Sequence, residues 1–259
     1  MKRLFIMLYS ITNYTLGVVA LNYLIAFLFN LFVPNAIDSG TALVTADNAA
    51  IAVAINLGLI TLFGLQHSVM ARPSFKSWLT RYIPAAAERS TYMIATALVV
   101  FTLCFLWQPL PAVLWQAESE LAYYTLLAIG LSGWVLVLFS TFLINHFDLF
   151  GLRQAWLNLV GKKYTHLPFR TISLYKHVRH PIMTGVFIGI WFTPVMTLGH
   201  LLFALGMSAY ILIGVYHEEK DLIHIFGDRY LRYIRSTGKF FPLPARSKSI
   251  KGDALTTDL

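Results

Sequence analysis

LYKHVRHPIMTG stands at residues 174–185, and HEEKDLIHIFGDRYLRY stands at residues 217–233. The residues between them, 186–216, are mostly apolar. FFPLP follows at residues 240–244. An apolar stretch of this kind predicts a helical hairpin whose two ends return to one membrane surface. Ionisable residues at such a boundary point to function by default. We therefore expect the basic, histidine-containing box and the paired-glutamate box to meet in one pocket.

The composition of the whole chain is that of an integral membrane protein. Of its 259 residues, 57% are hydrophobic and 12% are charged, against roughly 25% charged in an average soluble protein. The length suits one membrane domain over residues 1–244, with every candidate motif in residues 121–244 and a polar, disordered tail over 245–259. Cys104, the single cysteine, excludes an intrachain disulfide and a cysteine-cluster metal site.

Hydropathy predicts an all-α, polytopic bundle of about six helical segments: 4–33, 49–70, 92–107, 121–145, 182–195 and 198–216. A spanning helix needs roughly 20 residues. Segment 182–195 is too short, since at 1.5 Å per residue it reaches only about 21 Å. We expect it to begin earlier, to tilt, or to stop at Pro194.

The distribution of positive charge predicts the orientation. All 20 Lys and Arg residues precede the first segment, follow the sixth, or lie between the second and third or the fourth and fifth. The positive-inside rule then places both termini and both boxes in the cytoplasm. The formal net charge of +8 is thus explained by topology and indicates contact with the lipid bilayer, which argues against nucleic-acid binding. The first apolar run is longer than a signal peptide requires, which favours a retained helix in an inner membrane.

Arg179, His180 and Pro181 are the core of the basic box. Pro181 suits the first turn of a helix, which would place Arg179 and His180 beside free backbone N–H groups that attract anions. The three residues could hold a carboxylate, or they could mark a helix start with cations facing lipid headgroups. Gly185 and Gly189 share one helix face, where they permit close helix packing or leave room for a ligand.

Glu218 and Glu219 are expected at the end of the sixth segment, about 100° apart around the helix. One carboxylate could bind an ammonium group while the other faces solvent or a cation. The alternative is a charged helix exit. His217, Asp221 and His224 form one helical stripe, for which an amphipathic surface is favoured over a metal site. The basic aromatic segment 229–235 predicts a helix on the membrane surface whose tyrosines could close over a pocket.

The sequence NHFDLFGLRQAW at residues 145–156 places a polar cluster at the end of the fourth segment. His146 is its best-placed candidate for a catalytic base, because an unperturbed histidine titrates near 6.5. A purely structural cluster is the alternative. Dinucleotide, NTPase, serine-hydrolase and zincin motifs are not found in the sequence.

The order R-H-P-x-x-x-G, hydrophobic hairpin, E-E-x-x-L-x-x-x-F-G-x-x-Y-x-x-Y and F-x-P resembles the integral membrane methyltransferases over about residues 165–244. That superfamily includes isoprenylcysteine and phospholipid methyltransferases. With residues 145–156, the LPFRT run and LYKHVRHP, the chain looks closer to the methanethiol S-methyltransferases, bacterial membrane enzymes. The resemblance implies S-adenosylmethionine-dependent methylation of a small thiol, methanethiol, to dimethyl sulfide.

Carried over residue by residue, the resemblance implies a cofactor pocket at the two boxes and the stretch before them. The candidate cofactor-binding residues are Leu167, Pro168, Phe169, Arg170, Tyr175, Arg179, His180, Pro181, Met183, Gly185, Glu218 and Glu219. His180 would donate to the methionyl carboxylate and a glutamate would accept from the amino group. Tyr175 or Phe169 would stack on adenine, and aromatic faces also favour a sulfonium cation.

Two positions depart from the superfamily pattern. Met183 replaces a tyrosine of the usual R-H-P-x-Y box. Gly214 stands where isoprenylcysteine enzymes often carry an arginine one turn before the glutamates. The loss of this anchor for a carboxylate favours a small neutral thiol. Lipid, prenylcysteine or amine methylation stays open as an enzymatic alternative, and a membrane transport or assembly protein as a non-enzymatic one.

Overall fold

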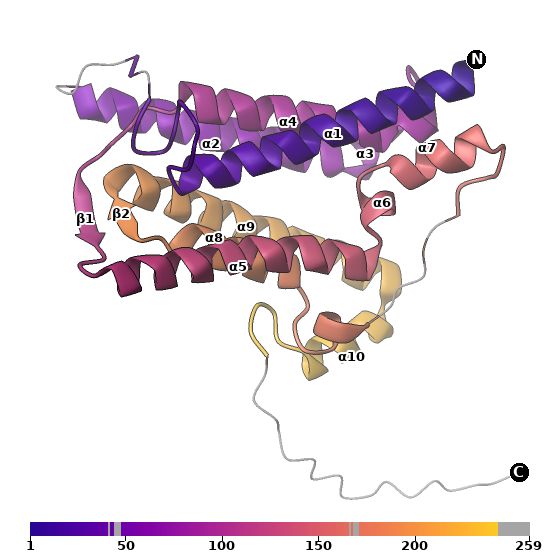
Figure 1. The fold of residues 1–259 in the computed structure, drawn as a ribbon. Helices are drawn as coiled ribbons and strands as arrows, with labels where there is room; N and C mark the ends of the chain where they lie inside the picture. Colours follow the sequence, from indigo (N-terminus) through magenta and orange to yellow (C-terminus); the bar gives the residue numbers. More distant parts are fainter. Residues whose placement is uncertain (41, 44–47, 166, 168–170, 243–259) are drawn as a thin grey trace, which may run out of the picture.

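The computed structural model describes residues 1–40, 42–43, 48–165, 167 and 171–242 (Figure 1). Within these residues, five helical segments are long and apolar enough to cross a membrane. They are α1 (Lys2–Leu28), α2 (Ala49–Ala71), η2 with α4 (Ala85–Ala87 and Glu88–Leu106), α5 (Glu120–Ile144) and α9 (Leu198–Phe226). With the shorter α8 (Pro181–Trp191) they confirm the predicted helical membrane bundle.

The long helices pack in two layers. Helices α1, α2 and α4 form one layer, and α5, α8 and α9 form the other (Figure 1). Between them lies an apolar core in which the Trp107 ring packs edge-on against Phe27 and Phe203, with ring centroids 6.2 and 5.8 Å away. Helix α4 begins at Glu88, before the apolar segment predicted at residues 92–107, because its polar first turn is also helical.

The predicted sixth segment is only partly helical. Helix α8 ends at Trp191 and rises only about 16 Å at 1.5 Å per residue. The chain then continues extended into β2 (Val195–Thr197), which pairs antiparallel with β1 (Val113–Gln116). Pro194 explains the early end, because proline lacks an N–H and disfavours a helical residue before it. The Pro194 carbonyl accepts a hydrogen bond from the Ala117 N–H at 2.9 Å, as backbone near a membrane requires.

Close packing of α5 on α8 explains the glycine stripe. A Cβ atom added at Gly185 would lie 2.5 Å from the Gly133 carbonyl oxygen, and one added at Gly133 would lie 2.5 Å from that of Gly185. A Cβ at Gly189 would meet the Trp134 ring nitrogen at 2.5 Å. Packing, rather than space for a ligand, is therefore what these glycines provide. Their close approach fixes the start of α8 beside the end of α5.

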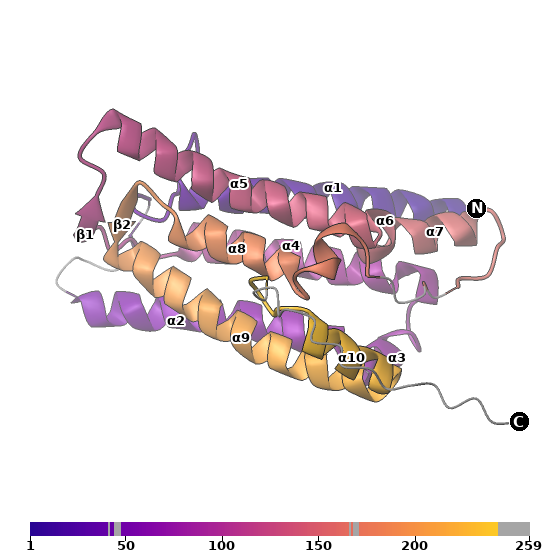
Figure 2. The same cartoon turned by 90° about the horizontal axis from the view of Figure 1, so that it is seen from below.

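Helix α9 is longer than the sequence indicated. It runs on past residue 216 to Phe226, so the paired glutamates lie within the helix and the prediction that they end it was wrong. The helix stops at Gly227, whose φ of +53° and ψ of −133° suit a residue without a side chain. Helix α10 (Asp228–Ser236) then folds back along the last turns of α9 (Figure 2).

Candidate functional site

A cavity of about 510 Å³ lies at the end of the bundle where α5 ends and α8 begins. This volume is within the range of small-molecule sites in proteins. The described residues that line it are Arg89, Leu143, Ile144, Asn145, Asp148, Tyr164, Leu167, Ile172, Tyr175, Arg179, His180, Glu218, Leu222, Phe226, Tyr230 and Tyr233. The two boxes of the sequence therefore meet at one cavity.

The basic box is held in place by the chain segment that follows α10. His180 is the N-cap of α8 and Pro181 is its first residue. The Arg179 N–H donates to the Gly238 carbonyl at 2.8 Å, and the His180 N–H donates to the Lys239 carbonyl at 3.1 Å. The Thr184 hydroxyl donates to the Phe240 carbonyl at 2.7 Å. These three hydrogen bonds fix the conformation of the basic box, which its own sequence does not determine.

The Glu219 carboxylate contacts Arg179, His180 and Lys239. Its Oε1 accepts from Arg179 Nε at 2.8 Å and lies 3.2 Å from His180 Nε2, while its Oε2 lies 2.9 Å from Lys239 Nζ. Arg179 also donates to the carbonyls of Ile234 and Thr237. The Glu219 side chain is 12% exposed and that of Arg179 is 7% exposed. Glu219 thus braces the basic box against α9 from a buried position. It also pairs with Arg179, which the sequence suggested as a partner for a ligand carboxylate.

Glu218 has the opposite environment. Its side chain is 52% exposed and lines the cavity, with Oε2 at 3.6 Å from His180 Nδ1. Burial lowers the pKa of His180, and the Glu219 carboxylate only partly opposes this, so the ring is neutral at pH 7. Its one N–H points from Nε2 to Glu219, because a carboxylate can only accept. Nδ1 and Glu218 Oε2 are then two acceptors facing each other, an arrangement that a donor would stabilise.

Aromatic rings line the same cavity. Tyr175, Phe226, Tyr230 and Tyr233 come from η3 (Ser173–Lys176), the end of α9 and α10. The Tyr233 hydroxyl donates to the Tyr175 carbonyl, which ties α10 to η3. Burial raises the pKa of Tyr233 to about 12 and also raises that of Tyr175. The phenols therefore stay neutral, and their ring faces suit an adenine or a cation.

A second network secures the loop beyond α7 (Leu152–Leu159). Arg153 Nη1 donates to Asp148 Oδ1 at 2.8 Å and to the Thr165 carbonyl at 3.0 Å. The Tyr164 hydroxyl donates to Asp148 Oδ2 at 3.3 Å. Asp148 begins this network in α6 (His146–Leu149), whose N-cap Asn145 accepts from the Asp148 N–H. The network holds Tyr164 over the cavity.

His146 does not reach the cavity. It is buried, with Nε2 at 2.8 Å from the Tyr14 hydroxyl and Nδ1 at 2.8 Å from the Thr141 hydroxyl. Its ring stacks on Phe142 at 4.1 Å. With both ring nitrogens occupied and the ring directed toward α1, the structure does not place this histidine where a substrate base would act. Burial also lowers its pKa, which suits a neutral residue that links α1 to α5.

His146→Ala should therefore act on stability. Loss of two hydrogen bonds and a ring contact should cost about 2 kcal/mol of unfolding free energy. Activity per folded protein should stay within about threefold of wild type, which thermal unfolding in detergent and turnover on the same preparation would show. A large loss of turnover at unchanged stability and cofactor affinity would instead make His146 the base.

The remaining sequence candidates are placed as follows. Leu167 lines the cavity, whereas Pro168, Phe169 and Arg170 fall outside the described residues. Pro181, Met183 and Gly185 belong to the first turns of α8, and the described cavity lining does not include them. Sequence reasoning missed Arg89, in the first turn of α4. Its only signal in the sequence was a positive charge at the boundary of an apolar segment that lies far from both boxes along the chain.

The fold and the cavity define a polytopic helical membrane protein with a candidate small-molecule cavity at one end of its bundle. Comparison with known proteins identifies the family. The chain is 47% identical over 235 residues to methanethiol S-methyltransferase 1 of Bradyrhizobium diazoefficiens, covering 91% of this chain and 81% of that protein. It is 43% identical over 246 residues to methanethiol S-methyltransferase of Mycobacterium tuberculosis, covering 95% and 99%.

The chain belongs to the methanethiol S-methyltransferase family. A more distant similarity, 30% identity over 207 residues, links it to Nurim of Sus scrofa and covers 77% of this chain and 76% of that protein. No protein-family model matches the chain, and no solved structure matches it.

Proposed function

We propose that the protein transfers the methyl group of S-adenosylmethionine to a small thiol, methanethiol, and forms dimethyl sulfide. The observation that carries the proposal is the pair of facing acceptors, His180 Nδ1 and Glu218 Oε2, 3.6 Å apart at the edge of an aromatic cavity. The names of the relatives at 47% and 43% identity support the same reaction.

The cavity residues fit the methyl donor. An α-ammonium group would donate to both acceptors, which removes the unfavourable contact between them. Arg89 lines the same cavity and would hold the carboxylate, a role that the sequence suggested for His180. Tyr175 and Phe226 would pack on adenine. When bound, S-adenosylmethionine supplies an electrophilic methyl group on a sulfonium sulfur.

The protein contributes position and a dry surrounding for the acceptor. The apolar side of the cavity is formed by Leu143, Ile144 and Leu222, and Leu143 and Ile144 are the last residues of α5, which is long and apolar enough to cross a membrane. A small apolar thiol would therefore reach the cavity from the bilayer. Transfer forms a carbon–sulfur bond to the acceptor, breaks the bond between the donor sulfur and its methyl group, and releases the thiol proton.

The affinity for S-adenosylmethionine should fall in acid. The lowered pKa of His180 places its protonation below the usual value of about 6.5. Protonation puts an N–H on Nδ1, which then repels the ammonium group instead of accepting from it. We expect a constant KM for S-adenosylmethionine between pH 7 and 8 and a rise only below pH 6.5. A KM that is already rising between pH 8 and 7 would contradict this assignment.

The proposal is tested by following the fate of a labelled methyl group. Membranes with and without the protein receive methyl-labelled S-adenosylmethionine and methanethiol, and label is counted in headspace dimethyl sulfide and in extracted lipid. Labelled dimethyl sulfide that requires both the protein and the thiol is expected. Label that appears only in lipid would replace the thiol by a lipid acceptor. Absence of label transfer, with no binding of S-adenosylmethionine, would remove the methyltransferase proposal.

A further inference from the structure

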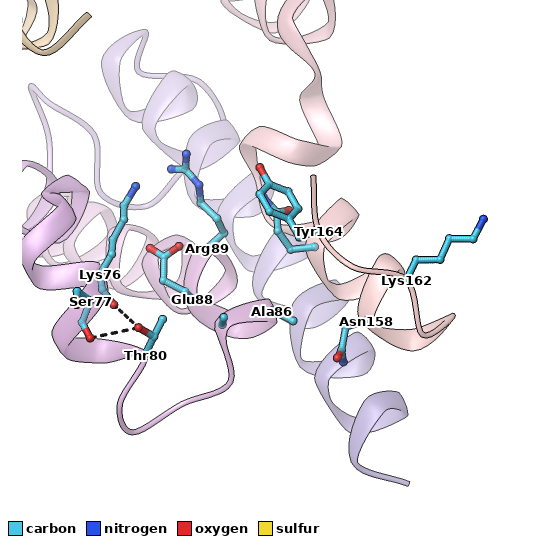
Figure 3. A pocket seen from close by; sticks show the side chains of 11 residues that line it. Lys76, Ser77, Thr80, Ala86, Glu88, Arg89, Asn158, Lys162 and Tyr164 are labelled. Carbon is cyan, nitrogen blue, oxygen red and sulfur yellow. Dashed lines mark hydrogen bonds between the residues drawn. The ribbon is translucent and has the colours of Figure 1, made fainter. Parts of the chain in front are cut away.

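A second cavity, of about 450 Å³, lies on the other side of Arg89 and Tyr164 from the candidate active site. It is enclosed by α3 (Pro73–Leu79), the turn through η2 and helix α7 (Figure 3). Its described lining is Lys76, Ser77, Thr80, Ala85, Ala86, Glu88, Arg89, Gln154, Asn158, Lys162 and Tyr164. The proposed methyl transfer gives this cavity no task.

Positive charge dominates the cavity. Three cations, Lys76, Arg89 and Lys162, line it together with one acid, Glu88. Figure 3 shows Lys76, Glu88 and Arg89 close together and Lys162 extending outward at the rim. Burial lowers the pKa of the Lys76 ammonium and the nearby Arg89 guanidinium lowers it further, while the Glu88 carboxylate partly opposes both effects. A bound anion would act in the same direction as Glu88 and stabilise the charged lysine.

Unpaired amide groups show that the cavity is prepared for more than a bare anion. Gln154 is 8% exposed and its Nε2 donates to the Asp148 carbonyl at 3.0 Å, which fixes the orientation of the amide. Its Oε1 has no hydrogen-bond partner among the described residues, and neither has Nδ2 of Asn158. Leaving a buried acceptor unpaired is costly. The ligand should therefore carry a hydrogen-bond donor as well as an anionic group, and the Gln154 amide would turn toward the cavity to accept from it, because Oε1 is shielded from solvent in this structure.

The surroundings place the cavity at the level of lipid headgroups. It lies where α2 ends and α4 begins, both at the edge of membrane-spanning segments. On α3, the Trp78 ring packs against Phe75 at 5.3 Å and against Tyr82 at 5.4 Å, and Trp78 and Tyr82 are exposed. Exposed Trp and Tyr rings are enriched at membrane interfaces. The aromatic group thus marks the depth of the cavity.

We propose that this cavity binds the headgroup of a phospholipid, with the phosphodiester at Lys76 and a hydroxyl or ammonium donor at Gln154. The lipid is not a methyl acceptor here, because it occupies a separate cavity and its acyl chains would remain in the bilayer. A glycerol headgroup fits best, since it combines an anionic phosphodiester with neutral hydroxyl donors. The proposal does not rest on the methyltransferase assignment.

Lipid binding to the purified full-length protein tests the proposal. Native mass spectrometry in detergent would compare phosphatidylglycerol with phosphatidylcholine, which has the phosphate but no donor beyond it. We expect wild type to bind phosphatidylglycerol about tenfold more tightly than the double variant Lys76→Gln/Lys162→Gln does. The control, Arg81→Gln/Lys163→Gln, removes the same charge from exposed residues of the same two segments and should bind like wild type.

Each of three results would overturn the proposal. The two double variants could lose affinity equally, which would reduce binding to a general surface charge effect. Phosphatidylcholine could bind as tightly as phosphatidylglycerol, which would remove the role of Gln154. Soluble glycerophosphoglycerol could bind as tightly as the intact lipid, which would make the ligand a free phosphate ester. Both double variants are required to elute as monodisperse protein with wild-type thermal stability, so that misfolding does not produce the result.

Discussion

Glu218→Gln should weaken the binding of S-adenosylmethionine by about 10- to 100-fold, which corresponds to the loss of one charge-assisted hydrogen bond of about 1.5–3 kcal/mol. The substitution keeps the shape of a side chain that lines the cavity and is 52% exposed, but it removes the negative charge beside His180 Nδ1. The KM for S-adenosylmethionine should rise, while the melting temperature should hardly change.

Asp221→Asn is the matched control for this prediction. Asp221 lies on the same helix, pairs with Arg72 at 3.4 Å, and has a side chain that is 61% exposed and not among the described cavity-lining residues. It should leave the KM unchanged. An unchanged KM in Glu218→Gln as well would show that the methyl donor does not contact this glutamate.

Glu219→Ala should mainly reduce stability, by about 3–5 kcal/mol, because removal of one partner leaves a buried charge uncompensated. Arg179 is only 7% exposed and would lose its carboxylate. The segment that pairs with the basic box through Gly238 and Lys239 should then detach. Thermal unfolding in detergent should show the loss, and limited trypsin digestion should show faster cleavage at Lys239.

Lys239→Ala separates this effect from a simple loss of charge. The substitution removes the Lys239 ammonium group, which pairs with Glu219 and belongs to a side chain that is 40% exposed. It should therefore cost no more than about 1 kcal/mol of unfolding free energy. Equal and small losses in the two variants would contradict a bracing role for Glu219. A large loss in Glu219→Ala alone would support it.

The membrane bundle and the meeting of the two boxes follow from patterns that extend over many residues. Long apolar runs predict spanning helices whatever their neighbours are. A hairpin between a basic and an acidic box brings its ends together by geometry alone. Proline at the start of α8 is a local signal that acts within one turn.

The finer features depend on contacts between distant segments. Short strands such as β1 and β2 carry no periodic signal in a chain rich in apolar residues. Hydropathy ended the last helix near residue 216 because the polar turns that follow look like a loop, although α10 packs against them. Likewise, Glu218 and Glu219 differ in environment because Arg179 and Lys239 lie beside Glu219. The burial of His146 depends on Tyr14 from α1.

The most direct test of the central claim, that the cavity between the two boxes binds the methyl donor, is photolabelling with radioactive S-adenosylmethionine followed by peptide mapping. Ultraviolet light would attach the ligand to aromatic residues within contact distance. Label is expected in peptides that contain Tyr175, Phe226, Tyr230 or Tyr233, and excess unlabelled S-adenosylhomocysteine should abolish it. Competable label confined to peptides from α1 to α4 would contradict the claim.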